Sequence, residues 1–288
     1  MMKYKSYAKI KSGQDGASFG NLLFRFGSRG NCSVYDLSCA KACGEELVPV
    51  AEFLLDRAEE IAPHSNAVMF GKEYYAEGDE FPLLYSNIYN NYKNSDDKLV
   101  GVLCVYRIFR EGEGFSSSLV GLIEIGFTAD RSLWRSGGDV EDVRPYGNFV
   151  LDNESGRLYA FVMRDGERTV RYFSFDTPDV RGGAICKRFG VPRVVLGSSD
   201  IKEYFDVPYH NYVQGATLRA GKIYSLEGFG EKIHPALRVI DLAQRKQTAF
   251  IDLYDPGLTD EAELIDFYGD ICLYSDAHGN VFELSEIE

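Results

Sequence analysis

A four-residue pattern recurs along this sequence: a glycine, a polar residue, and then two apolar or aromatic residues. It occurs at residues 20–23 (GNLL), 156–159 (GRLY), 221–224 (GKIY) and 269–272 (GDIC). A short apolar run precedes each copy, and a second run containing an acidic residue follows it (CSVYDL, VRYFSFD, ALRVIDL and NVFELS). A glycine at such a junction predicts a tight turn, because a positive φ costs little only without a β-carbon. Each copy therefore predicts a meander of three antiparallel strands.

The spacing of the four glycines indicates a fifth unit. Successive glycines are 136, 65 and 48 residues apart, so the first interval is about twice as long as the next. Residues 66–127 contain four further apolar runs (NAVMFG, FPLLYSNIYN, LVGVLCVYRIF and SSLVGLIEIGF), with turn residues at 78–79 and 95–97. We interpret these runs as a degenerate copy of the unit. The 19 Phe, 19 Tyr and 29 Gly residues also favour many short strands joined by turns.

Five such units in succession resemble the five-bladed β-propellers, an all-β architecture in which small sheets surround a central channel. The resemblance extends over essentially the whole chain, but it concerns architecture only, since the WD and kelch signatures are absent. The last unit stops one strand short, at VFELSEIE, whereas KYKSYAKI near the N-terminus belongs to no unit. The resemblance implies that this N-terminal strand completes the last blade and closes the ring, which removes exposed sheet edges.

We expect residues 1–288 to form one domain, because repeat architectures of this size with 45% hydrophobic residues bury one continuous core. Only residues 50–61 (VAEFLLDRAEEI) show a helical spacing of apolar residues, ending just before Pro63, and they predict one helix. The predicted blades span residues 14–62, 63–128, 144–200, 210–254, and 261–288 together with 3–11.

The charge balance narrows the classes of partner. The chain has 44 acidic and 31 basic residues, a formal charge of -13 and a pI of about 4.9. Such a chain repels the phosphates of nucleic acids and anionic membrane surfaces. The N-terminal MMKYKSYAKIKSG lacks the apolar centre of a signal peptide, and no stretch is long and apolar enough to span a bilayer. The sequence therefore predicts a cytoplasmic protein with neither a nucleic-acid nor a membrane partner.

The cysteines predict neither a disulfide framework nor a metal site. Six cysteines are spread over a long chain, and we expect them to be reduced. Cys39 and Cys43 could share a helix face, but no further zinc ligands lie nearby in the sequence. No phosphate-cradling loop is present either. We therefore expect no bound metal and no cofactor.

If the blades are aligned on their first strands, the residues that open each blade gather at one mouth of the channel. Carboxylates, amides, a histidine and an arginine converge there beside tyrosines, a combination that suits a small hydroxyl-rich or anionic ligand. The predicted ligand-binding residues are Gln14, Asp15, His64, Asn66, Arg144, Tyr146, Tyr212, Gln214 and Glu263.

Two of these residues have a structural alternative. His64 follows the rigid Pro63 and could act as a general base, but the sequence shows no partner to orient it, so its ring can equally hold the blade entry in place. Arg144 could clamp a carboxylate or phosphate, or it could pair with the acidic residues just before it at positions 139, 141 and 142.

The leading hypothesis is a non-enzymatic module that binds a small polar ligand, such as a carbohydrate, or a segment of a partner protein at the channel mouth. The alternative is an enzyme similar to the glycoside hydrolases, some of which are five-bladed propellers, with Asp15 and Glu263 as the carboxyl pair and His64 nearby. Three blades depart from that pattern, since they offer His64, Arg144 and Gln214 instead. A third possibility is a protein-interaction scaffold that presents Tyr85, Tyr89 and Tyr92.

Overall fold

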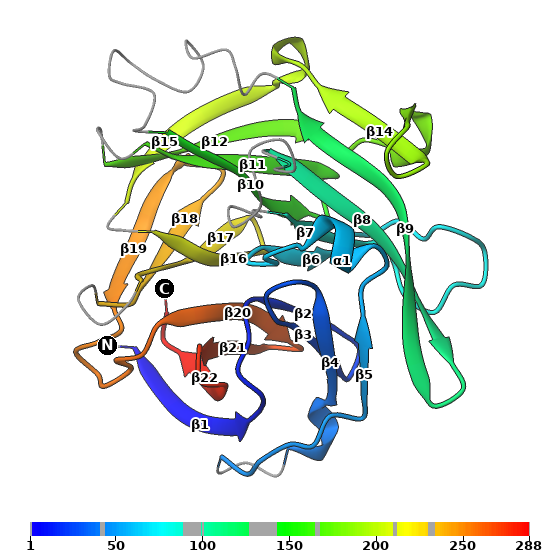
Figure 1. The fold of residues 1–288 in the computed structure, drawn as a ribbon. Helices are drawn as coiled ribbons and strands as arrows, with labels where there is room; N and C mark the ends of the chain where they lie inside the picture. Colours follow the sequence, from blue (N-terminus) through cyan, green and yellow to red (C-terminus); the bar gives the residue numbers. More distant parts are fainter. Residues whose placement is uncertain are drawn as a thin grey trace.

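Five small sheets stand around a common centre in the computed structural model of the chain (Figure 1). This arrangement confirms the predicted five-bladed β-propeller. The structure describes residues 2–40, 44–88, 99, 101–126, 143–164, 168–209, 212–229 and 234–287, and for residues 143–147 it describes the backbone only. No helix within these ranges is long and apolar enough to cross a membrane.

Three of the sheets are antiparallel four-stranded meanders that begin at the channel and run outward in chain order. The first contains β2 (Gly16–Phe19), β3 (Leu22–Phe26), β4 (Asn31–Asp36) and β5 (Ala51–Leu54). The third contains β10 (Val143–Asp152), β11 (Arg157–Arg164), β12 (Thr169–Asp176) and β15 (Glu203–Pro208). The fourth contains β16 (Val213–Arg219), β17 (Lys222–Glu227), β18 (Ala236–Asp241) and β19 (Lys246–Asp252).

The second sheet is the degenerate unit, and it has six strands. Its first four strands match the predicted runs: β6 (Val68–Phe70), β7 (Leu84–Asn87), β8 (Val102–Glu111) and β9 (Gly114–Ile125). Its two outer strands are β13 (Ala184–Cys186) and β14 (Val191–Leu196), of which β14 pairs with β9 in parallel. A loop of residues 71–83 replaces the tight turn found in the other blades.

The fifth sheet closes the ring as predicted. It contains β20 (Ala262–Tyr268), β21 (Ile271–Asp276), β22 (Asn280–Ser285) and, outermost, β1 (Lys3–Lys9). Strand β1 runs antiparallel to β22, from Lys3 opposite Ser285 to Lys9 opposite Asn280. The two ends of the chain therefore meet in one blade, as Figure 1 shows.

The recurring glycines lie in the turns between the first and second strands of their blades. Gly20, Gly156, Gly221 and Gly269 have φ values of +57°, +71°, +70° and +57°, the left-handed region in which a glycine costs least. The prediction that these glycines supply turn geometry is confirmed. The strands that precede Gly20 and Gly221 are β2 and β16, and each is the first strand of its sheet.

Two predictions of local structure were wrong. Residues 50–61 do not form one helix, because Ala51–Leu54 pairs with β4 as β5, and only α1 (Ala58–Ile61) is helical. The alternating burial of β5 shows that a two-residue period fits this segment as well as the helical one. In addition, residues 184–196 lie in the second sheet, although they were predicted to belong to the third blade at 144–200. The outermost strand of the third blade is instead β15, which lies beyond that range. Among the described residues, the short 3₁₀ helices η1 (Leu37–Cys39), η5 (Val180–Gly182) and η6 (Ser198–Asp200) lie in connections.

Apolar side chains fill the spaces between neighbouring blades. Between the first and second sheets, the ring of Phe24 lies edge-on to Phe70, Phe81 and Phe115 at centroid distances of 5.3, 5.5 and 5.5 Å. Phe24 and Phe81 are 0% and 2% exposed, so each contributes a large apolar area to the interface. This packing joins the first and second blades.

Candidate functional site

A cavity of about 630 Å³ lies at the end of the channel where the first strands begin, and we call it the central cavity. All five sheets, or the segments next to them, contribute to its wall. It is lined by Gln14, His64, Asn66, Met163, Tyr212, Val213, Gln214, Phe229, Glu261, Glu263 and Ala277. Six of the residues predicted from the sequence are among them: Gln14, His64, Asn66, Tyr212, Gln214 and Glu263.

Two glutamates and two glutamines form the most polar part of this wall. Gln14 donates from Nε2 to Glu263 Oε1 at 3.2 Å, and Gln214 donates from Nε2 to Glu261. Glu263 is only 3% exposed. Burial raises the pKa of Glu263 well above its usual value, against the opposing effect of Arg25, and the nearby Glu261 raises it further. Glu263 therefore keeps its proton to a higher pH than an ordinary glutamate does.

The second blade supplies an imidazole and an amide network. Burial lowers the pKa of His64, so at neutral pH the ring is neutral and can both donate and accept a hydrogen bond. Asn87 donates from Nδ2 to Asn66 Oδ1 at 2.5 Å and to Asn148 Oδ1 at 2.8 Å. Asn87 Oδ1 in turn accepts from Ala67 N at 3.1 Å. Asn66 is thus held in place by partners from its own sheet and, through Asn87, from the third.

An apolar and aromatic wall faces these polar groups. The rings of Tyr212 and Phe229 contact each other with centroids 5.5 Å apart and an interplanar angle of 52°. They are 41% and 55% exposed. Phe229 and Met163 were not predicted, because they follow or end second strands, whereas the prediction considered only residues that open a blade. Glycines flanking Phe229 in the sequence GFG are a signal of an exposed aromatic loop.

Asp15 does not line the central cavity, so its predicted contact with a ligand is corrected. It is 1% exposed and accepts a hydrogen bond from Val68 N at 3.0 Å through Oδ2, which ties the first sheet to the second. Burial raises its pKa well above the usual value, although hydrogen bonds from the backbone of Gly16 and Val68 act in the opposite direction. Because Asp15 lies just before a first strand, the end of the channel at which it lies was predicted correctly. Its side chain, however, is buried inside the protein.

The predicted residues of the third blade are only partly described. Strand β10 places the backbone of Arg144 opposite Met163, which lines the central cavity. The side chains of Arg144 and Tyr146 lie outside the described part of the structure. No group of three or more His, Cys, Asp or Glu residues suited to a metal ion occurs among the described residues.

The predicted interaction surface at Tyr85, Tyr89 and Tyr92 is not present at Tyr85. That side chain is 2% exposed, and burial together with the nearby Glu73 and Asp179 raises its pKa to about 12. A buried phenol cannot anchor a partner protein. Residues 89 and 92 lie outside the described residues.

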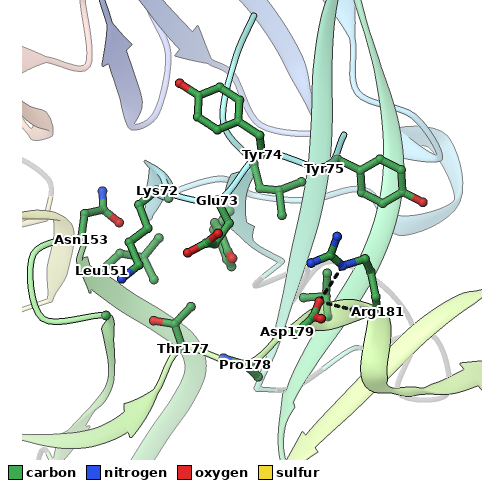
Figure 2. A pocket seen from close by; sticks show the side chains of 15 residues that line it. Lys72, Glu73, Tyr74, Tyr75, Leu151, Asn153, Thr177, Pro178, Asp179 and Arg181 are labelled. Carbon is green, nitrogen blue, oxygen red and sulfur yellow. Dashed lines mark hydrogen bonds and ion pairs between the residues drawn. The ribbon is translucent and has the colours of Figure 1, made fainter. Parts of the chain in front are cut away.

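Tyr85 instead forms part of a smaller cavity of about 300 Å³ at the opposite end of the channel, between the second and third blades. Figure 2 shows the labelled side chains around it, including Lys72, Glu73 and Thr177. On one side Arg181 donates to Asp179 from Nε at 2.8 Å. We call this the lower cavity. Its charges of both signs are mostly exposed, so it defines no ligand class as clearly as the central cavity does.

Comparisons with known proteins support the fold. The chain is similar to the crystal structure of a glutaminyl cyclase from Myxococcus xanthus, with a TM-score of 0.50 and 12% identity over 98% of this chain and 94% of that one. It is also similar to a PQQ-bound aldose sugar dehydrogenase from Streptomyces coelicolor, with a TM-score of 0.50 and 12% identity over 99% of both chains. No family model matches the sequence, and no curated protein matches it significantly. At this identity the likeness concerns the fold alone, so the chain is a five-bladed β-propeller whose activity must be argued from its own site.

Proposed function

We propose that this protein binds a small hydroxyl-rich ligand of monosaccharide size in the central cavity, without catalysing a reaction. The observation that carries the proposal is the convergence of side chains from all five blades on one cavity of about 630 Å³. Small-molecule sites commonly have volumes of about 300 to 1,000 Å³ and combine an apolar wall with a few convergent polar groups.

The chemistry of the wall favours hydroxyl groups. Carboxyl and amide groups of Glu261, Glu263 and Gln214 can accept from and donate to several hydroxyls at once. The exposed rings of Tyr212 and Phe229 offer an apolar surface for the C–H face of a sugar ring. Since the neutral His64 adds another donor and acceptor, the cavity can bond a polyol without needing a charge on it.

A hydrolase is the second candidate, and one observation favours it. Glu261 and Glu263 line the same cavity, and the raised pKa of Glu263 suits a general acid. A glycoside hydrolase needs such an acid and a second carboxylate beside the scissile bond. Glu261 replaces Asp15 as the second carboxyl group in this hypothesis, because Asp15 does not reach the cavity.

A binding experiment tests the leading proposal. Thermal unfolding and calorimetric titration of the full chain are measured with glucose, galactose, mannose, xylose and inositol. A ligand present at a hundred times its dissociation constant should stabilise the protein by about 2.7 kcal/mol, which corresponds to a rise in Tm of about 5 °C for a chain of this size. Glu261→Gln and Phe229→Ala should each weaken binding about tenfold or more.

Glu154→Gln is the matched control, because Glu154 is exposed in the turn between β10 and β11 at the opposite end of the channel. It should bind the ligand like the wild type. If none of these ligands binds, or if the control loses as much affinity as Glu261→Gln, the proposal is wrong. Steady hydrolysis of an aryl glycoside that Glu263→Gln abolishes while it still binds the sugar would establish the hydrolase instead.

A further inference from the structure

A second cavity of about 430 Å³ adjoins the central cavity at the same end of the channel, and we call it the side cavity. Gln14 and Ala277 line both cavities and therefore lie at the boundary between them. The remaining wall comes mainly from the first blade and the segment that enters it. It consists of Lys11, Ser12, Gly13, Arg25, Gly27, Ser28, Asn31, Ser33 and Glu52.

Arg25 is the buried member of this wall. Its side chain is 2% exposed, and it donates from Nη2 to the carbonyl oxygens of Gly13 at 2.8 Å and Asp276 at 3.2 Å. Its Nε and Nη1 have no hydrogen-bond acceptor within the described residues. A β-carbon on Gly13 would lie 2.7 Å from Phe26 O and 3.0 Å from Arg25 Nε, so a glycine lets the entering chain lie against both. Buried donors of a charged group are costly unless an acceptor satisfies them.

The acids around Arg25 compensate its charge only in part. Asp15 and Glu263 have pKa values raised well above the usual range, mainly by burial and against the effect of Arg25, so they ionise only at a higher pH than ordinary carboxyl groups do. The carboxylate of Asp276 accepts from Asn280 N at 2.9 Å and from Asn280 Nδ2 at 2.6 Å. Because arginine stays protonated at any physiological pH, positive charge remains next to the side cavity.

The rim of the side cavity is rich in hydrogen-bond donors. Ser12, Ser28 and Asn31 contribute two hydroxyls and an amide. The one carboxylate of the rim, Glu52, is engaged by Lys11 Nζ at 2.6 Å and by the hydroxyl of Ser33 at 2.7 Å. Donors around a buried guanidinium are the arrangement that carboxylate and phosphate groups bind.

We propose that the side cavity is an anion subsite and that the ligand of the central cavity is an anionic sugar. Its carboxylate or phosphate lies on the Arg25 side of Gln14, and its hydroxyls face the glutamates of the central cavity. The part that concerns the sugar rests on the proposed function, whereas the anion subsite stands on the side cavity alone. A uronate and a sugar phosphate share this chemistry, and titration distinguishes them.

The test compares glucose, glucuronate, glucose 6-phosphate and inorganic phosphate by calorimetric titration of the full chain at low ionic strength. We expect at least one anionic sugar to bind about tenfold or more tightly than glucose, with an advantage that shrinks as salt is added. Lys11→Met should reduce this advantage about fivefold, and Glu52→Gln should increase it by a similar factor, since they change the rim charge in opposite directions. Neither should change the affinity for glucose.

Lys5→Met is the matched control, because Lys5 pairs with Glu283 at 2.8 Å on the outer strand of the fifth blade and does not line the side cavity. It should leave all affinities unchanged. If glucose binds but the anionic sugars bind no more tightly, the subsite is refuted and the proposed function stands. If no sugar binds but inorganic phosphate does, and Lys11→Met weakens it, the subsite stands alone. Equal effects of Lys11→Met and Glu52→Gln in one direction, or no binding of any probe, overturn the inference.

Discussion

The two ends of the channel are built by different means. At the lower end the blades turn through short glycine hairpins, and a β-carbon added at Gly20, Gly221 or Gly269 would meet no atom within 4 Å. At the upper end, where the central cavity lies, the first strands begin among buried polar groups, and a β-carbon on Gly16 would lie 2.6 Å from Phe24 O in its own blade and 2.8 Å from Leu264 Cδ1 in the fifth. The conformation of the turn backbone therefore limits which residues fit at the lower end, whereas tight packing within and between blades limits them at the upper end.

This difference explains where a site can form. Contacts between blades at these turns are made by single exposed side chains, such as Arg219, which donates to Gly269 O and Asp270, so they bring fewer polar groups together than the buried strand starts do. The lower cavity occurs beside the one blade in which the long loop of residues 71–83 replaces the hairpin. At the upper end every blade brings side chains to one axis, which creates both the central cavity and the buried charges next to it.

The most direct test of the difference between the two ends is a glycine-to-alanine substitution at each of them. Gly16→Ala should destabilise the protein by about 3 kcal/mol, because the new methyl group would lie 2.6 Å from Phe24 O, in the next strand of the same blade, and 2.8 Å from Leu264 Cδ1 in the fifth blade, so backbone and side chain must both shift. Urea unfolding of the wild type and the variant measures the difference. A loss below about 1 kcal/mol would show that the upper end adjusts as easily as a surface turn.

The pH dependence of the unfolding free energy should also differ between residues at the two ends. Asp15 has a raised pKa in the folded protein, so the stability that it contributes is full below about pH 4 and is lost as the pH rises through the folded value. Asp15→Asn should reduce the slope of the unfolding free energy against pH by up to about 1.4 kcal/mol per pH unit over the range in which Asp15 titrates. Glu263 and Asp266 have raised pKa values too, so part of the slope should remain.

Asp176, at the lower end of β12, provides the control of opposite sign. A hydrogen bond from Lys202 lowers its pKa, so its contribution is present at neutral pH and is lost as the pH falls through the folded value. Asp176→Asn should therefore slightly reduce stability at pH 7, whereas Asp15→Asn should raise it at a pH above the folded pKa of Asp15. Unfolding free energies measured from pH 2 to pH 9 check both signs. Parallel curves for the wild type and Asp15→Asn would contradict the prediction.

The smallest expected effect is at the lower end. Gly221→Ala should cost about 1 kcal/mol, since the only penalty is a β-carbon at a φ of +70°, partly offset by the lower entropy of the unfolded chain. The same urea experiment measures it. A loss as large as that of Gly16→Ala would mean that the turn carries contacts beyond its own backbone.

Most of the fold could be predicted from the sequence because its signals are local. The glycine turns and the degenerate second blade follow from turn chemistry and from the apolar runs on either side, and the resemblance to five-bladed propellers implied the closing N-terminal strand. The helix predicted at residues 50–61 does not form, because the spacing of its apolar residues suits a two-residue period as well as a helical one. Pairing with β4 makes Ala51–Leu54 a strand. Residues 184–196 join the second sheet through the parallel pairing of β14 with β9, which no local sequence pattern predicts.

Only the part of the candidate site that follows from strand order could be predicted from the sequence. Alignment of the first strands placed His64, Gln214 and Glu263 at one mouth, and the structure brings them to one cavity. The same rule could not show that Asp15 turns inward, because neighbouring residues of a strand face opposite sides and the register decides which is which.

By itself, the sequence determined that the chain forms repeated strands joined by glycine turns and that the repeats number five, because turn geometry and apolar periodicity act over a few residues. Only the tertiary structure decided which polar groups lie in water and which are buried. The raised pKa values of Asp15 and Glu263 and the buried guanidinium of Arg25 arise from burial against other blades. Desolvation depends on neighbours distant in the chain, so the chemistry of this site exists only once the ring is closed.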